Sequence, residues 1–308
     1  MNRSFAVRSA TSVLILTVMA ALAQIFSDRE IIFPEIAAIA TGALLVPGIA
    51  WKTSKKRIFA TIMICAVLGV LIVLYCPGPV WFQMSVAFLI GQLVLSVSGT
   101  SFAPCVSAIV LPVMLQAATA VYLLSAFCFT TGILLVRVMF ERLRILPEKK
   151  DTDFEPSDLP PARFVFSKTA LGILWIVIAM MSGMTFAAAP PVLVAYTESC
   201  NSKSGLHSSW QMLFKGSILI MLCAMTGSYL RLGVCVNAHL PLAVATAIGM
   251  ILVILMMSGF HMFLPPAAAL CMLAMLIPED RLMLYPVQVG CGALVLFLLG
   301  RLSSDEIK

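Results

Sequence analysis

The sequence predicts an all-α integral membrane protein, a polytopic helical bundle with an internal duplication. Hydrophobic residues make up 61% of the 308 residues and charged residues only 11%, and the mean hydropathy is +1.05. Soluble domains are about 45–50% apolar and about 25% charged. Many apolar runs approach the ~20 residues that a membrane helix needs. The basic residues lie in short clusters between these runs, so the net charge of +6 indicates topology rather than nucleic-acid binding. This composition excludes a soluble enzyme and a disordered chain.

The length criterion for membrane helices divides the chain into twelve apolar segments. In chain order they are 9–26, 31–50, 58–75, 80–98, 102–117, 120–140, 166–184, 186–199, 213–230, 233–257, 262–278 and 283–300. Four of them, 31–50, 102–117, 186–199 and 262–278, are short or interrupted by proline. The sequence therefore predicts twelve membrane segments, or eight full spans with four partial ones.

The first segment has two interpretations. Arg3 and Arg8, an apolar run and the small residues at 20–23 form the pattern of a cleaved signal peptide. However, the segment 166–184 occupies the corresponding place in the second half. We therefore expect the first helix to be a retained structural element.

A polar stretch divides the chain into two membrane bundles, 1–145 and 166–308. The linker at 146–165 is rich in charged residues and proline, so it cannot bury an apolar face. Clusters of Lys and Arg lie around residues 3–8, 52–57, 137–150 and 301–308, separated by even numbers of segments. The positive-inside rule then places the linker and both termini in the cytoplasm, and we expect a bacterial inner membrane. Arg231 is an exception, near a predicted outer boundary.

Four patterns recur in the two halves in the same order and at nearly constant spacing. They are Arg57-x7-Cys65-x3-Gly69 with Lys215-x7-Cys223-x3-Gly227, 34–41 with 190–197, 98–104 with 258–265, and 141–143 with 300–302. The alternative is chance similarity between apolar helices. A duplicated chain can move two similar bundles around a central site, as secondary transporters do. Six segments per half give both halves one orientation, whereas a re-entrant segment in each half would invert the repeat.

The proline-broken segments are the best candidates for a transport site, because they occupy corresponding positions in the two halves. Proline suits the first turn of a helix, and the small residues after it allow close helix packing. A helix that begins inside the membrane points its positive dipole end inward, which favours an anion or the polar head of a solute. The alternative is that the prolines are only kinks within Ala-rich packing.

The candidate substrate-binding residues lie in or beside these four segments. They are Glu35, Thr41, Ser101, Pro104, Ser107, Pro190, Thr197, Glu198, His261, Pro265 and Pro266. Glu35 is either a helix N-terminal carboxylate or a proton or cation site, since ionisable groups inside membranes tend to be functional. Glu198 is either a site residue or a boundary residue. His261 either handles substrate or protons, because histidine titrates near neutral pH, or caps a helix.

The proline-alanine segments resemble those of the HPP family of integral membrane proteins, named for a His-Pro-Pro motif. The stretch 101–143, with Pro104, Ser107 and Pro112 before a long apolar helix, resembles the motif helix and its successor, and 33–42 resembles an earlier Pro-rich helix. The resemblance covers most of 31–145 and, more weakly, 186–302, so the chain looks like two fused HPP-like units. An intact His-Pro-Pro is absent: the second unit has Leu264-Pro265-Pro266. The resemblance implies transport of small anions.

Motifs for catalysis and for metal binding are absent from the sequence. It contains no HExxH, GxSxG or Walker pattern, and its nine cysteines, which we expect to be buried thiols, include no CxxC pair. We therefore expect no enzyme activity, no cofactor and no metal. The sequence favours a gradient-driven transporter or channel for a small solute. The alternatives are a non-transporting scaffold or assembly partner, and an aromatic-acid exporter-like membrane domain. The expected partners are the lipid bilayer, the solute, and a second copy or an accessory protein, but no nucleic acid.

Overall fold

The fold of the computed structural model is helical throughout the residues it describes, which are 3–148, 161–201 and 210–305. The α-helices are α1 (Arg3–Ile25), α2 (Glu35–Ala40), α3 (Lys55–Tyr75), α4 (Val80–Val97), α5 (Pro104–Leu115), α6 (Ala120–Arg142), α7 (Ala162–Met181), α8 (Pro190–Asn201), α9 (Trp210–Leu230), α10 (Leu242–Gly259), α11 (Pro265–Leu273) and α12 (Tyr285–Asp305). The π-helical segments η2 (Thr41–Leu45) and η6 (Arg231–Asn237) extend α2 and α9. Three short 3₁₀ turns, η1 (Arg29–Ile31), η4 (Thr185–Ala188) and η7 (Glu279–Arg281), complete the described secondary structure.

The all-helical character predicted from the sequence is confirmed. Within the described residues, seven helices are long and apolar enough to cross a membrane, and each of the twelve predicted segments contains one α-helix. The four segments marked by proline contain the four shortest helices, α2, α5, α8 and α11. Proline lies just before or at the start of each one, where its fixed φ and missing N–H favour helix initiation.

Several predicted boundaries were wrong. The first helix begins at Arg3 rather than residue 9, because its basic first turns are helical. The tenth segment was expected from residue 233, but α10 begins at Leu242, after η6 and a turn in which His239 has a φ of 52°. The helix α7 begins at Ala162, directly after Pro161, so residues 162–165 are not part of the linker. The part of that linker at 149–160 lies outside the described residues.

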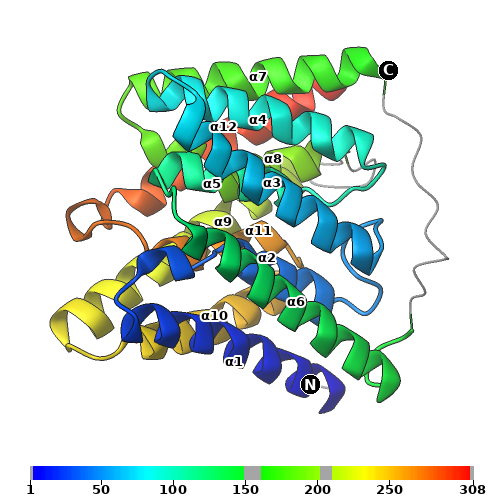
Figure 1. The fold of residues 1–308 in the computed structure, drawn as a ribbon, viewed down its shortest axis with the longest axis vertical. Helices are drawn as coiled ribbons and strands as arrows, with labels where there is room; N and C mark the ends of the chain where they lie inside the picture. The colour runs from blue at the N-terminus through cyan, green and yellow to red at the C-terminus, as the bar shows by residue number, and fades with distance from the viewer. Residues whose placement is uncertain (1–2, 149–160, 202–209, 306–308) are drawn as a thin grey trace.

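The short helices lie in the middle of the molecule and the long helices surround them (Figure 1). In this view α3, α4, α7 and α12 lie on one side of the short helices, and α1, α6 and α10 lie on the other. The long helix α1 packs against α10, and α4 packs against α7. Large apolar side chains face outward on these helices, among them Leu14, Leu124 and Leu135, each more than 60% exposed. A lipid-facing perimeter requires such a surface.

The cysteines divide between the core and the perimeter. Cys65, Cys223 and Cys271 are buried as expected, whereas Cys128 on α6 and Cys291 on α12 are exposed. The expectation of uniformly buried thiols was therefore wrong for these two. Both lie on long helices whose outward faces are apolar, where a thiol behaves as a small hydrophobic group.

Two glycines allow long helices to pack closely against short ones. A Cβ atom at Gly69 of α3 would lie 2.6 Å from the carbonyl oxygen of Ile109 in α5. A Cβ atom at Gly227 of α9 would lie 2.4 Å from the carbonyl oxygen of Cys271 in α11. These distances are too short for any side chain, so both helix pairs depend on glycine at the crossing point.

Buried arginines bind the C-terminal ends of two short helices. Arg8 Nη1 donates to Leu45 O at 2.9 Å, and Arg137 Nη1 donates to Ala43 O at 2.7 Å, both at the end of η2. Arg231 donates to Met275 O, just after α11. Cations are favoured at helix C-termini, where unpaired carbonyls carry partial negative charge. Arg231, which did not fit the topology pattern, is 6% exposed and serves as such a cap.

Candidate functional site

The first turns of all four short helices surround one narrow space at the centre of the bundle. Each helix contributes two residues one turn apart: Glu35 and Ala38 from α2, Pro104 and Ser107 from α5, Pro191 and Val194 from α8, and Pro266 and Ala269 from α11. The space is too narrow to admit a water molecule. The sequence marked these four proline-broken segments as the best candidates for a site, and the structure brings their first turns together.

The helices α2 and α5 reach the space from opposite directions. The N–H of Phe33, just before α2, lies 3.5 Å from Met19 Sδ, and Arg8 binds the carbonyl at the end of η2, so α2 runs antiparallel to α1. The side of the bundle on which α1 begins is named the terminal side below. The segment before α5 lies near this side, where Lys52 N–H donates to Ser101 Oγ at 2.9 Å. The N-termini of α2 and α5 therefore point toward each other.

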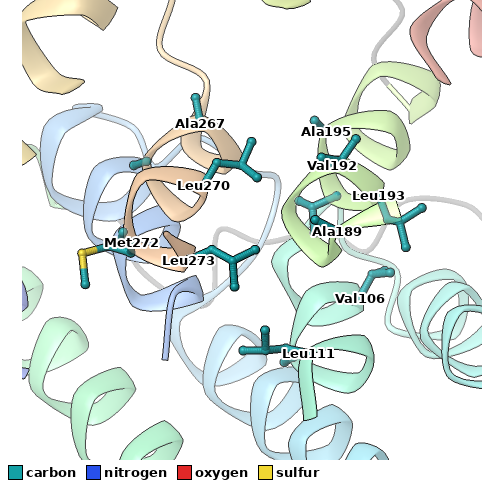
Figure 2. Close-up of a cluster of buried hydrophobic side chains, with 14 of the residues drawn as sticks. Val106, Leu111, Ala189, Val192, Leu193, Ala195, Ala267, Leu270, Met272 and Leu273 are labelled. Carbon is teal, nitrogen blue, oxygen red and sulfur yellow. The ribbon is translucent and has the colours of Figure 1, made fainter. Parts of the chain in front are cut away.

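Apolar packing holds α5, α8 and α11 around the space (Figure 2). Val106 of α5 lies beside the start of α8, Leu111 lies further along α5, and Leu270 and Leu273 of α11 point toward α5 and α8. All four side chains are fully buried. Such packing fixes the starts of α5, α8 and α11 relative to one another.

Only two polar side chains line the space, and they bind each other. Ser107 Oγ donates to Glu35 Oε1, and both residues are 1% exposed. Within the described part of the chain, Glu35 Oε2 is buried and has no hydrogen-bond partner, and no basic side chain forms an ion pair with Glu35. A buried carboxylate without a cation is costly, so this group carries the strongest chemical signal of the site.

Backbone donors at these helix starts are largely occupied. In α8, Pro190 and Pro191 have no N–H, and Val192 and Leu193 both donate to Ala189 O, at 2.8 and 3.2 Å. First-turn N–H groups of α2, α5 and α11 likewise donate to carbonyls just before each helix. The helix dipoles still point their positive ends at the space. The donors that would hold an anion by hydrogen bonds are mostly used within the turns themselves.

A second polar cluster joins the two halves of the chain at α8. It lies beyond Val194, toward the C-terminal end of that helix. Gln92 Nε2 of α4 donates to Thr197 Oγ1 at 2.7 Å, and Trp51 Nε1 donates to Glu198 Oε1 at 2.7 Å. Gln92 Oε1 is buried and has no partner in the described structure. The Trp51 ring lies edge-on to Phe102, with centroids 4.9 Å apart. Thr197 and Glu198 were predicted site residues, and both belong to this cluster.

Of the two side chains that bind α8 in this cluster, Gln92 could be recognised from the sequence and Trp51 could not. Gln92 lies inside an apolar span, and a polar residue there is a recognisable signal that was not used. Trp51 follows the second segment in a loop, where nothing in the local pattern indicates that its ring reaches α8.

The other predicted site residues divide into those at the space and those away from it. Pro190 and Pro265 begin α8 and α11 one residue before the lining prolines. Thr41 Oγ1 donates to carbonyls within its own helix. Ser101 belongs to the loop before α5. His261 is exposed, has a φ of 51° and follows the C-cap of α10, so it lies at a helix end and outside the central space.

Comparison with known proteins gives no match: no family model, no curated protein and no solved structure is similar to this chain.

Proposed function

We propose that the protein is a gradient-driven transporter or channel for a small solute, and that the solute passes between the four short helices. The observation that carries the proposal is the central space, where four proline-initiated helices from both halves enclose one unpartnered carboxyl oxygen. Broken helices that meet inside a bundle are the usual construction of transport sites. A buried ionisable group without a partner is rarely kept for stability.

We infer further that the two halves are copies of one unit with the same orientation. Tyr122 OH of α6 donates to Ala108 O of α5 at 2.9 Å, and Tyr285 OH of α12 donates to Leu270 O of α11 at 2.7 Å. Each tyrosine ring lies edge-on to a phenylalanine that precedes a short helix, with centroids 5.4 Å apart in both pairs. Matching contacts in matching places support duplication. They also support movement of one bundle against the other as the transport mechanism.

The proposed orientation follows from charge. The chain begins and ends on the same side of the bundle (Figure 1). On that terminal side Glu141 forms ion pairs with both Lys55 and Arg137, each with an N–O distance of 2.7 Å. Because the basic clusters gather there, we propose that the terminal side is cytoplasmic, in a bacterial inner membrane. Membership in the HPP family stays a prediction.

The nature of the solute is constrained by the site. The positive helix ends favour negative charge, which supports an anion, but few backbone donors remain to bind one. Glu35 and Ser107 present mainly acceptor oxygens. We therefore propose a small solute that contacts Glu35 and Ser107 directly. The solute is either an anion beside a neutral Glu35 or a hydrogen-bond donor to Glu35.

Transport through the central space is tested by blocking it. The purified protein is reconstituted in proteoliposomes and assayed for uptake of a panel of small inorganic and organic anions, amines and neutral solutes. The variant Ala269→Phe fills the space and should abolish any uptake that the native protein shows. Leu135→Phe adds the same ring on the lipid-facing perimeter and should leave uptake unchanged.

The alternatives make different predictions in the same experiment. A scaffold or assembly partner shows no uptake of any solute and purifies with another membrane protein. An exporter-like domain, whose expected partner is a periplasmic adaptor protein, shows uptake of aromatic acids only, and only when that adaptor is present. Uptake that survives Ala269→Phe in a well-folded protein would place the path elsewhere and refute the proposal.

A further inference from the structure

We propose that the transporter is driven by protons, and that Glu35 is the residue that binds and releases the proton. This inference rests on the proposed function and deepens it, since it assigns the coupling ion to the same central site.

The surroundings of Glu35 offer its charged form little compensation. Its one side-chain donor among the described residues is Ser107, and the other residues that line the space are alanine, valine and proline. A proton on Oε2 removes the charge, and release of the proton recreates it. The central space thus has two electrostatic states that differ by a full charge, which is what coupling to a gradient requires.

Groups on the neighbouring helices do not neutralise Glu35. The helices packed against α2 are α1, α5, α6 and α11. Their titratable side chains in the described structure are Arg3 and Arg8 of α1, Cys105 of α5, Tyr122, Cys128, Arg137, Glu141 and Arg142 of α6, and Cys271 of α11. Arg8 and Arg137 bind carbonyls at the opposite end of α2 and η2, and the Tyr122 hydroxyl donates to Ala108 O.

A proton fits the site better than a metal cation. Hard cations such as Ca²⁺ and Mg²⁺ take about six or more oxygen ligands. The side chains around the space provide two carboxyl oxygens and one hydroxyl oxygen, and the space does not admit a water molecule. A proton needs one lone pair, which Oε2 has free.

The correspondence between the halves shows that this pair is specific to the first half. Among the residues that line the space, Pro191 of α8 takes the place that Glu35 takes in α2, and Ala269 of α11 takes the place that Ser107 takes in α5. The fold therefore forms the same helix starts without a carboxyl group. Since the second copy does without it, Glu35 is a functional addition to the central space.

Protonation of Glu35 can be measured without knowledge of the solute. Infrared difference spectra of the full chain in liposomes, recorded between alkaline and acidic buffer, contain a carboxylic C=O band for each carboxylate that gains a proton. A band should be lost in Glu35→Gln and retained in Glu198→Gln, the matched control in the second cluster. Ser107→Ala should move the band to higher frequency, because the carbonyl loses a hydrogen bond.

The same experiment separates the proton from a metal ion. A band that responds to added NaCl at constant pH, and not to pH, would overturn the proposal in favour of a metal cation. A difference spectrum that is identical in the native protein and in Glu35→Gln would also overturn it.

Transport assays then separate failure of coupling from failure of the proposed function. For a solute that the native protein takes up, an inward pH gradient should drive accumulation. Glu35→Gln should lose this accumulation while it still exchanges labelled for unlabelled solute. Accumulation by Glu35→Gln equal to the native level refutes proton coupling alone. No uptake by any variant, with the infrared band intact, refutes the proposed function and leaves the protonation of Glu35 in place.

Discussion

The hydrogen bond between Trp51 and Glu198 should stabilise the contact between the two halves, and Trp51→Phe tests this. Trp51 is 4% exposed, and its Nε1 donates to Glu198 Oε1 at 2.7 Å. Phenylalanine keeps an aromatic ring in the place that now packs over Gly42 and beside Phe102, but it has no donor. The change therefore removes one hydrogen bond and part of a ring.

The expected cost can be worked out from this geometry. A hydrogen bond to a charged group contributes about 1.5–3 kcal/mol, and one between neutral groups about 0.5–1.5 kcal/mol. We therefore expect Trp51→Phe to lower the free energy of unfolding by about 1–3 kcal/mol. A double-mutant cycle with Glu198→Leu isolates the bond from the lost ring volume, and its coupling energy should be about 1–2 kcal/mol.

Equilibrium unfolding in mixed detergent micelles measures the four proteins of this cycle. Trp175→Phe is the matched control, because Trp175 Nε1 donates to Ala187 O at 2.9 Å within the second half. It should show no coupling to Glu198→Leu. A coupling energy near zero between Trp51 and Glu198 would refute the reasoning, since the bond would then contribute nothing across the two halves.

Three further outcomes follow from the structure. Arg137→Met leaves Glu141 with Lys55 as its remaining partner and removes the donor to the Ala43 and Pro47 carbonyls, so it should lower the free energy of unfolding by up to about 3 kcal/mol in the same assay. Gly227→Ala forces a methyl group against backbone and should cost about 1–3 kcal/mol, whereas Gly132→Ala, with open space around it, should be neutral or slightly stabilising. Single cysteines at the exposed residues Ser27 and Glu148, in a cysteine-free background, should react with impermeant thiol reagents from opposite sides of the membrane. Reaction of both from one side would contradict the proposed orientation.

The sequence predicted the scaffold of the site better than its chemistry. Prolines at 34, 104, 190 and 265 marked the short helices, because proline initiates helices and ends the segment before it. Repetition in both halves indicated that these helices share a site. Local patterns of this kind depend on residues close in the chain, so they are visible in a single sequence.

The pairing of side chains was not predictable in the same way. Ser107 and Glu35 are 72 positions apart, and Trp51 and Glu198 are 147 positions apart. No local pattern fixes such contacts, because they depend on how helices are packed. His261 is a similar case: its local sequence allowed both a role in substrate or proton handling and a role at a helix end, and the structure places it at the surface directly after the C-cap of α10.

Under the proposed proton coupling, the single carboxyl group among the described residues that line the central space sets a limit on the energy available for transport. Because Pro191 occupies the corresponding place in the second half, a transport cycle would move one proton rather than two. A membrane potential of ~100 mV contributes about 2.3 kcal/mol per charge, and one pH unit contributes about 1.4 kcal/mol. The two contributions add up to about 3.7 kcal/mol, which would concentrate a neutral solute roughly 500-fold at most. Uptake of a neutral solute beyond this ratio at such a gradient would require a second ion.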